Sequence, residues 1–243
     1  MIERQLDIAT RDGATTTFIT HPEREGPHPV IVFFMDAPAI REELRDMARR
    51  FAAVGYYVML PNLYYREGEM EIGPLSTDPK DPGRIRMTEL MNTLSIPMVL
   101  SDFDAMVDFA GKDPAADVSR IGTVGYCMSG RFALCAGGHK PGQVKASASI
   151  YGVKLVTDKD NSPHLVAKAS PAEFYIACAE TDHWAPMEMV EQMQKELAGA
   201  HGEVELYMGA EHGFAFPKRH CYDRTSAERH WERLFSLFRR NLG

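Results

Sequence analysis

A cysteine near the middle of the chain lies in a glycine-rich segment that favours nucleophilic chemistry. The segment Gly125-Tyr126-Cys127-Met128-Ser129-Gly130 overlaps the end of an apolar stretch typical of a buried strand, Ile121 to Tyr126. Residues 128 to 137 then suit a helix rich in small residues. A sharp turn from strand to helix strains its central residue, and small neighbours let the chain pass without clashes. The spacing therefore predicts a nucleophile elbow with Cys127 at its tip.

The helix expected after Cys127 would assist a thiolate in two ways. Its N-terminal dipole favours negative charge, and the backbone amide of Met128 would point to where the oxyanion of a tetrahedral intermediate forms. A lone cysteine is more often a small buried core residue. The strand and helix on either side of Cys127 favour the catalytic interpretation.

A nucleophilic thiol needs a base, and the base needs an acid that orients it. Asp182 follows an expected strand, Phe174 to Cys178, and His212 follows the next one, Val204 to Met208. The order nucleophile, acid, histidine is that of α/β hydrolases. We therefore predict a triad of Cys127, Asp182 and His212.

Three neighbouring residues are rivals for these roles. His183 is an alternative base, although its adjacency to Asp182 makes a bond between the two side chains awkward. Glu180 and Glu211 are alternative acids. Taken singly, an Asp before a helix is usually a cap and a histidine usually structural, so the prediction depends on their joint placement.

The elements that must position these residues alternate between strand and helix. Residues 1 to 20 suit a hairpin around Arg11-Asp12-Gly13. Strands are expected at 30–35, 56–60, 121–126, 146–151, 173–178 and 203–208, and helices at 41–54, 99–110, 128–137, 186–198 and 222–239. Such alternation predicts an α/β fold, with a mostly parallel sheet covered by helices on both faces.

Two segments are expected to lack regular structure. Residues 61 to 89 contain Pro61, Pro74, Pro79 and Pro82 among charges, which predicts a long surface excursion of the kind that often lines a site. A loop is expected between the strands at 146–151 and 173–178.

Composition excludes several classes of function. The chain has 243 residues and a net charge of −7, so it has no general basic field to attract nucleic acid. Its longest apolar runs have six residues, far fewer than the ~20 that a membrane-spanning helix needs. The segment Met1-Ile2-Glu3-Arg4 leads into no apolar export sequence. A soluble, cytoplasmic protein is expected.

The chain has no linker rich in Gly, Ser or Pro, which predicts one domain over residues 1–243. Its cysteines show no regular spacing and are expected to be free thiols: Cys127, Cys135, Cys178 and Cys221.

The sequence resembles the dienelactone hydrolase family, small α/β hydrolases with a Cys-His-Asp triad. The resemblance is carried by the elbow segment, by Asp182-His183 followed by Pro186, by Glu211-His212-Gly213-Phe214-Ala215, and by Pro61-Asn62-Leu63-Tyr64. These segments occur in matching order across most of the chain. The resemblance implies a hydrolase that acts on a small ester or lactone.

The resemblance also implies roles for residues outside the triad. A family glutamate that switches the resting thiol to thiolate corresponds to Asp36, which is one methylene shorter and is alternatively a brace for its loop. The amide of Ala37 corresponds to the second oxyanion donor. Of two arginines that bind the substrate carboxylate, one corresponds to Arg84, with Arg86 as its neighbour, and the other corresponds to Phe216.

These features predict a hydrolase that needs no cofactor. The alternatives are an esterase or thioesterase of other substrates, and a non-catalytic redox sensor whose exposed thiol is oxidised. A metal enzyme is the weakest alternative. His212, His220 and Cys221 lie near one another in sequence, but they form no close-spaced ligand pair on one element.

Overall fold

The structure is a computed structural model that describes residues 1–73, 76 and 78–243. Its contacts divide the chain into two compact units, Met1–Val118 and Ser119–Gly243. The single domain expected over residues 1–243 stays a prediction.

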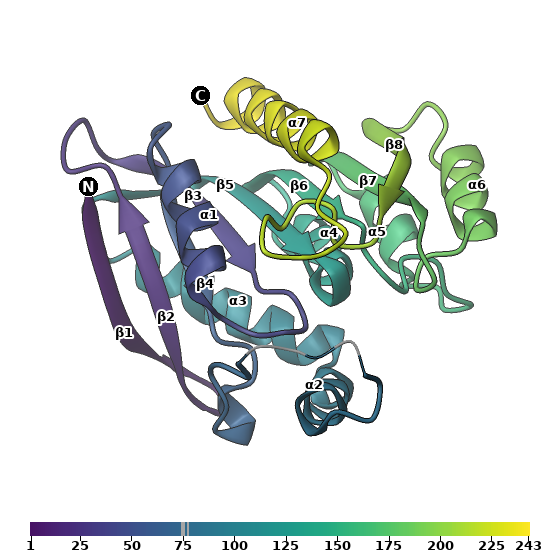
Figure 1. The fold of residues 1–243 in the computed structure, drawn as a ribbon. Coiled ribbons are helices and arrows are strands. Elements are labelled where there is room, and N and C mark those ends of the chain that lie inside the picture. Colours follow the sequence, from purple (N-terminus) through teal and green to yellow (C-terminus); the bar gives the residue numbers. More distant parts are fainter. Residues whose placement is uncertain (74–75, 77) are drawn as a thin grey trace. The chain divides into compact units, whose positions relative to one another are not determined.

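The first unit contains a hairpin, two further strands and three α-helices (Figure 1). In chain order its elements are β1 (Ile2–Thr10), β2 (Gly13–His21), β3 (His28–Phe34), α1 (Glu42–Ala52), β4 (Tyr57–Pro61), a 3₁₀ turn η1 (Tyr65–Glu67), α2 (Pro82–Thr93) and α3 (Ile96–Ala110). β1 pairs with β2 and β2 with β4 in antiparallel fashion, whereas β3 pairs with β4 in parallel. The hairpin expected in residues 1–20 is confirmed.

Helices cover both faces of this part of the sheet. Neighbouring residues of a strand point to opposite faces. On β2, the Thr17 hydroxyl lies 3.6 Å from the sulfur of Met106 in α3, whereas the ring of Phe18 lies under Arg49 of α1, 5.4 Å from its Cζ. Hence α1 and α3 pack on opposite sides of the strands.

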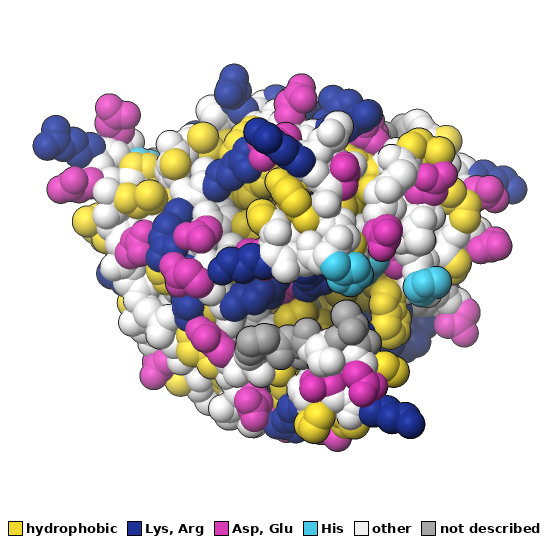
Figure 2. Space-filling model, viewed as in Figure 1, with side chains coloured by type: hydrophobic (Ala, Val, Ile, Leu, Met, Phe, Trp, Pro, Cys, Tyr) yellow, Lys and Arg dark blue, Asp and Glu magenta, His cyan; other side chains and the backbone are white. Residues whose placement is uncertain are grey.

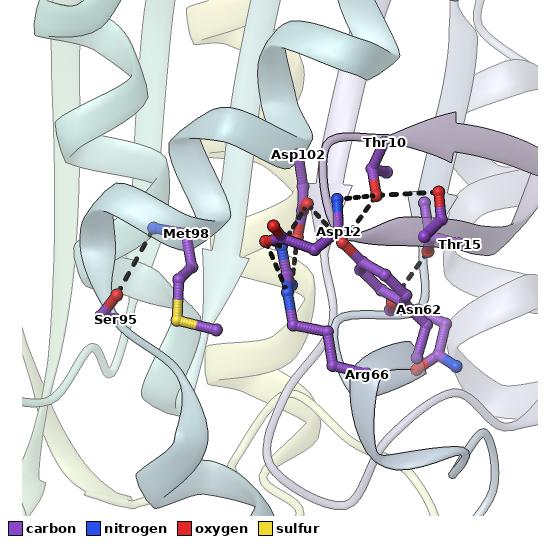
Figure 3. A network of polar contacts seen from close by, with 10 residues as sticks. Thr10, Asp12, Thr15, Asn62, Arg66, Ser95, Met98 and Asp102 are labelled. Carbon is purple, nitrogen blue, oxygen red and sulfur yellow. Dashed lines mark hydrogen bonds and ion pairs between the residues drawn. The ribbon is translucent and has the colours of Figure 1, made fainter.

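A partly buried polar network joins the hairpin to the segment after β4 and to α3 (Figure 3). The Arg66 guanidinium donates two hydrogen bonds to Asp102, of 2.9 and 2.8 Å, and two to Asp12, of 3.0 and 2.7 Å. The Tyr65 hydroxyl donates to Asp102 at 2.9 Å and lies 2.7 Å from the Thr10 hydroxyl. Because the arginine and both carboxylates are paired, the network holds three elements of the first unit together.

The second unit alternates strand and helix throughout. Its elements are the end of β5 (Ala116–Tyr126), a 3₁₀ turn η2 (Cys127–Ser129), α4 (Gly130–His139), β6 (Val144–Ile150), α5 (Pro163–Ala169), β7 (Glu173–Thr181), α6 (Met187–Glu196), β8 (Gly202–Glu211) and α7 (Arg224–Leu242). The strands pair in parallel in the order β5, β6, β7, β8.

Here too the helices cover both faces. The Thr123 hydroxyl of β5 donates a 2.9 Å hydrogen bond to the carbonyl of Ala133 in α4. On the other face, a Cβ atom at Gly122 would lie only 2.7 Å from the Phe238 ring of α7. The predicted α/β class, with mostly parallel strands between helices, is confirmed.

Two helices correct the sequence-based expectations. The excursion expected over residues 61–89 is irregular only in part, because α2 begins at Pro82 and is capped by Asp81, which accepts from the amides of Gly83 and Arg84. Only Leu90 of α2 is buried, so the sequence has no apolar stripe that would reveal this helix. The loop expected before β7 contains α5, whose seven residues are too few for a clear pattern. The predicted loop residue Pro74 lies outside the described residues.

The surface carries charges of both signs. On the face shown in Figure 2, Asp and Glu side chains lie among Lys and Arg side chains. Within the described ranges, no helix is both long and apolar enough to cross a membrane. All four cysteines are free thiols, as expected.

Candidate active site

Cys127 occupies a strained turn between β5 and α4. Its φ angle is +54°, in the left-handed region that residues with a Cβ atom rarely adopt. A Cβ atom on Gly125 would lie 2.2 Å from the carbonyl oxygen of Ser129, and one on Gly130 would lie 2.2 Å from the hydroxyl of Ser149. Only glycine fits at both positions, as expected of a sharp turn from strand to helix.

Asp182 and His212 meet because β7 and β8 are parallel and end at the same edge. Thr181, the last residue of β7, pairs with Glu211, the last residue of β8. The residue after each strand therefore lies beside its counterpart. The amide of His212 also donates a 3.1 Å hydrogen bond to the carbonyl of Thr181, which fixes its backbone next to Asp182.

The Asp182 carboxylate orients the His212 ring. Its Oδ2 atom lies 2.7 Å from Nδ1 of His212, and its Oδ1 atom accepts hydrogen bonds of 2.8 and 3.2 Å from the amides of Trp184 and Ala185. The Asp182 side chain has no exposed surface. These bonds hold the carboxylate in place, and they make Nδ1 the protonated nitrogen of a neutral imidazole.

The other ring nitrogen is on the side of the thiol. Nε2 of His212 is buried, and no described group makes a hydrogen bond of ordinary geometry with it. Burial by itself would lower the pKa of His212, but the nearby Cys127 thiolate and the Asp182 carboxylate outweigh it and raise this pKa to about 9. The thiol therefore lies close to the ring.

The three rival residues do not take these positions. Glu180 is exposed and accepts a 2.6 Å hydrogen bond from the amide of Gly209. Glu211 and His183 are exposed. Of these acids, only Asp182 reaches Nδ1 of His212.

Two residues that bear on this geometry were not predicted from sequence. Gly209, with φ of +78°, lies in an irregularity of β8 just before His212. Tyr151, with φ of +38°, packs its ring against His212. Glycine after a strand is a weak turn signal, and nothing in the residue type of Tyr151 indicates its backbone conformation.

In the first unit, Asp36 is part of an ion pair. Its fully buried carboxylate accepts hydrogen bonds of 2.6 and 3.2 Å from the guanidinium of Arg41. Arg41 also donates a 3.2 Å hydrogen bond to the carbonyl of Ala39, and the amide of Ala39 donates a 3.1 Å hydrogen bond to the backbone carbonyl of Asp36. The carbonyl of Ala37 accepts a 2.9 Å bond from the Tyr64 hydroxyl. The turn after β3, which contains the predicted oxyanion donor Ala37, is thereby braced on both sides.

The candidate substrate-binding arginines lie on α2. Arg84 is half-buried in its first turn and donates a 3.0 Å hydrogen bond to the carbonyl of Ser76. Arg86 lies 3.7 Å from the carboxylate of Glu69 and 3.5 Å from that of Glu89. Arg86 therefore lies near two carboxylates at the surface. Phe216, in the second unit, is fully buried.

Comparisons with known proteins identify the family of this chain. The model of the dienelactone hydrolase family matches residues 15–242. The chain belongs to this family.

Relatives match over nearly the whole chain. A protein of Escherichia coli strain K12 named "Putative carboxymethylenebutenolidase" is 32% identical over 229 residues, which are 91% of this chain and 80% of that protein. One of the same name from Methylorubrum extorquens is 29% identical over 245 residues, 98% of this chain and 81% of that protein. A crystal structure titled as that of a "Putative Dienelactone Hydrolase" from Klebsiella pneumoniae has a TM-score of 0.85 and 25% identity, covering 98% of both chains.

The protein is therefore a hydrolase of the dienelactone hydrolase family with an α/β-hydrolase fold. The family expected from the elbow, acid and histidine segments is confirmed. Among the described residues, no group of three or more His, Cys, Asp or Glu side chains is arranged to hold a metal ion.

Proposed function

We propose that this family member is a carboxylic ester hydrolase that cleaves a small ester or lactone through a thioester on Cys127. The observation that supports this most directly is the His212 ring, which is bonded to Asp182 through Nδ1 and lies near the Cys127 thiol. This arrangement gives a nucleophile, a base and an orienting acid. The relatives named as carboxymethylenebutenolidases favour a lactone as the substrate.

In the first half of the proposed reaction, the Cys127 thiolate attacks the carbonyl carbon and the carbonyl π electrons move to oxygen. The amides of Met128 and Ala37 stabilise this oxyanion. When the intermediate collapses, the C–O bond to the alkoxide breaks, and the alkoxide takes a proton from Nε2 of the His212 imidazolium. An S-acyl enzyme remains; with a lactone, the leaving oxygen stays attached to the acyl group.

In the second half, neutral His212 removes a proton from water, and the hydroxide attacks the thioester. The second tetrahedral intermediate expels the Cys127 thiolate and releases a carboxylic acid. Asp182 holds the protonated Nδ1 throughout and stabilises the imidazolium, which gives up a proton in the first half and forms again in the second. Atoms and electrons balance with water as the only co-reactant.

Two assignments carry over from the family as proposals. Arg84, on α2, is the candidate for binding a substrate carboxylate, and losing it is expected to harm acidic lactones more than neutral esters. Asp36 is the candidate thiol switch. Its bond to Arg41 favours the alternative role of bracing its turn, which a variant tests below.

Turnover of a chromogenic short-chain ester and of a dienelactone tests the proposal. Cys127→Ala is expected to abolish turnover, and His212→Ala to reduce it by about 10² to 10⁴. Mass spectrometry of the quenched wild type is expected to find the acyl group on Cys127. Equal turnover by wild type and Cys127→Ala would refute the proposal, and alkylation of Cys127 without any ester turnover would favour a redox sensor.

A further inference from the structure

Tyr151 has a strained backbone and a fully buried side chain. It directly follows β6, its φ angle is +38°, and its exposure is 0%. Its amide donates a 2.7 Å hydrogen bond to the carbonyl of Ala177 in β7. A bulky residue at positive φ is unfavourable and persists only where its surroundings require it, which is commonest near functional sites.

The Tyr151 ring contacts residues from both sides of the candidate site. Its centroid is 5.0 Å from that of the His212 ring, with the planes tilted by 57°. It lies 5.8 Å from the ring of Tyr126, the residue before Cys127. Phe214 and Phe216, just beyond His212, are 5.1 and 6.2 Å away. One side chain therefore connects the nucleophile turn with the base.

The backbone after Tyr151 is tied to the same turn. The amide of Val153 donates a 3.2 Å hydrogen bond to the carbonyl of Cys127. Gly152, between Tyr151 and Val153, packs so closely that a Cβ atom there would lie 2.2 Å from the Ser149 hydroxyl. The segment from Tyr151 to Val153 is thus fixed to β7 at one end and to the Cys127 turn at the other.

We propose that Tyr151 is a positioning residue that keeps Nε2 of His212 directed at the Cys127 thiol, an inference that rests on the proposed function. Asp182 holds the imidazole through one hydrogen bond at Nδ1. One hydrogen bond alone does not prevent the ring from rotating about that contact. The Tyr151 ring blocks this motion on one flank. Its own direction is set by the strained backbone and by the aromatic residues around it.

The test uses three variants of the full chain. Tyr151→Leu removes the aromatic wall, and Tyr151→Phe keeps it. Phe238→Leu is the matched control, because it also removes a fully buried aromatic ring from the second unit, but from α7 where it packs on Gly122. Comparing the two leucine variants separates loss of core packing from loss of positioning.

The main readout is the pH dependence of Cys127 alkylation by iodoacetamide, with the modified site located by mass spectrometry. A poorly placed imidazolium stabilises the thiolate less. In Tyr151→Leu the pH of half-maximal alkylation rate is therefore expected to rise by about one unit, a tenfold loss of thiolate at lower pH. Tyr151→Phe and Phe238→Leu are expected to keep the wild-type midpoint.

Turnover is the second readout. In Tyr151→Leu, kcat is expected to fall about tenfold or more with little change in KM, since misplaced reacting groups slow the chemical step. The inference is overturned if Tyr151→Leu and Phe238→Leu have the same alkylation midpoint and the same kcat. Alkylation needs no substrate, so this result is distinct from failure of the proposed function, which appears as undiminished turnover in Cys127→Ala.

Discussion

Glu180 accepts a 2.6 Å hydrogen bond from the backbone amide of Gly209, at the point where the pairing register of β7 and β8 shifts. Before the shift, Ala179 pairs with Tyr207, 28 residues further along the chain. After it, Thr181 pairs with Glu211, 30 residues further along. β8 thus gains two residues over β7. Those two residues bring His212, rather than an earlier residue of β8, beside Asp182.

Replacing Gly209 by alanine is expected to lower turnover about tenfold and the free energy of unfolding by about 1–2 kcal/mol. Its φ of +78° strains any residue with a Cβ atom, although the space around it is open. Relieving the strain would shift the two extra residues of β8, which form a β-bulge, and would move His212. Gly142→Ala is the matched control, with φ of +90° and equally open space. Chemical unfolding and steady-state kinetics check both variants, and equal loss of activity would contradict a role for the bulge.

Asp182→Asn is expected to reduce kcat by about 10³ to 10⁴ with a small effect on KM. Asparagine can still accept hydrogen bonds from the amides of Trp184 and Ala185 through one oxygen. Its NH₂ group would then face Nδ1 of His212 and favour the wrong tautomer. Glu211→Gln, an exposed change on the adjacent strand end, serves as control in the ester assay. A kcat for Asp182→Asn within tenfold of wild type would remove Asp182 from the proposed triad.

The sequence predicted the parts of the site that depend on element order. Cys127, Asp182 and His212 each follow an apolar strand, and parallel strands end at one edge, so their neighbourhood follows from the strand pattern. The glycines at 125 and 130 predicted the elbow because the backbone there leaves no room for a side chain.

The remaining features depend on contacts that a linear pattern does not contain. The bulge at Gly209 arises from the pairing register of two strands, and residue spacing within either strand does not reveal it. Tyr151 has an ordinary strand-like residue type, yet tertiary packing holds it at positive φ. The helix α2 was missed because it buries only Leu90.

The stability of the protein is expected to depend on pH through His212. Its pKa rises from 6.5 to about 9 on folding, so between these values the folded state binds more protons than the unfolded one. The stabilisation is fully present below pH 6.5 and is lost as the pH rises through 9. Urea unfolding of wild type, His212→Gln and the exposed control His220→Gln measures this effect. The free energy of unfolding of wild type should exceed that of His212→Gln by an amount that shrinks with rising pH. A difference that stays constant would contradict the raised pKa of His212 in the folded state.

Arg41→Met is expected to cost about 3–5 kcal/mol in the free energy of unfolding, because it removes the guanidinium from a fully buried carboxylate. Arg45→Met is the control: Arg45 pairs with the exposed Glu42 and Glu71, and its loss should cost at most about 1 kcal/mol. Chemical unfolding compares the two.

Asp36→Asn then distinguishes the two roles of Asp36. Its bidentate contact with Arg41 indicates a brace for the turn that contains Ala37. The variant should therefore lose stability while Cys127 is alkylated with the pH dependence of wild type. A shifted alkylation midpoint at unchanged stability would instead identify Asp36 as the thiol switch, since a brace affects the turn and a switch affects the charge on sulfur.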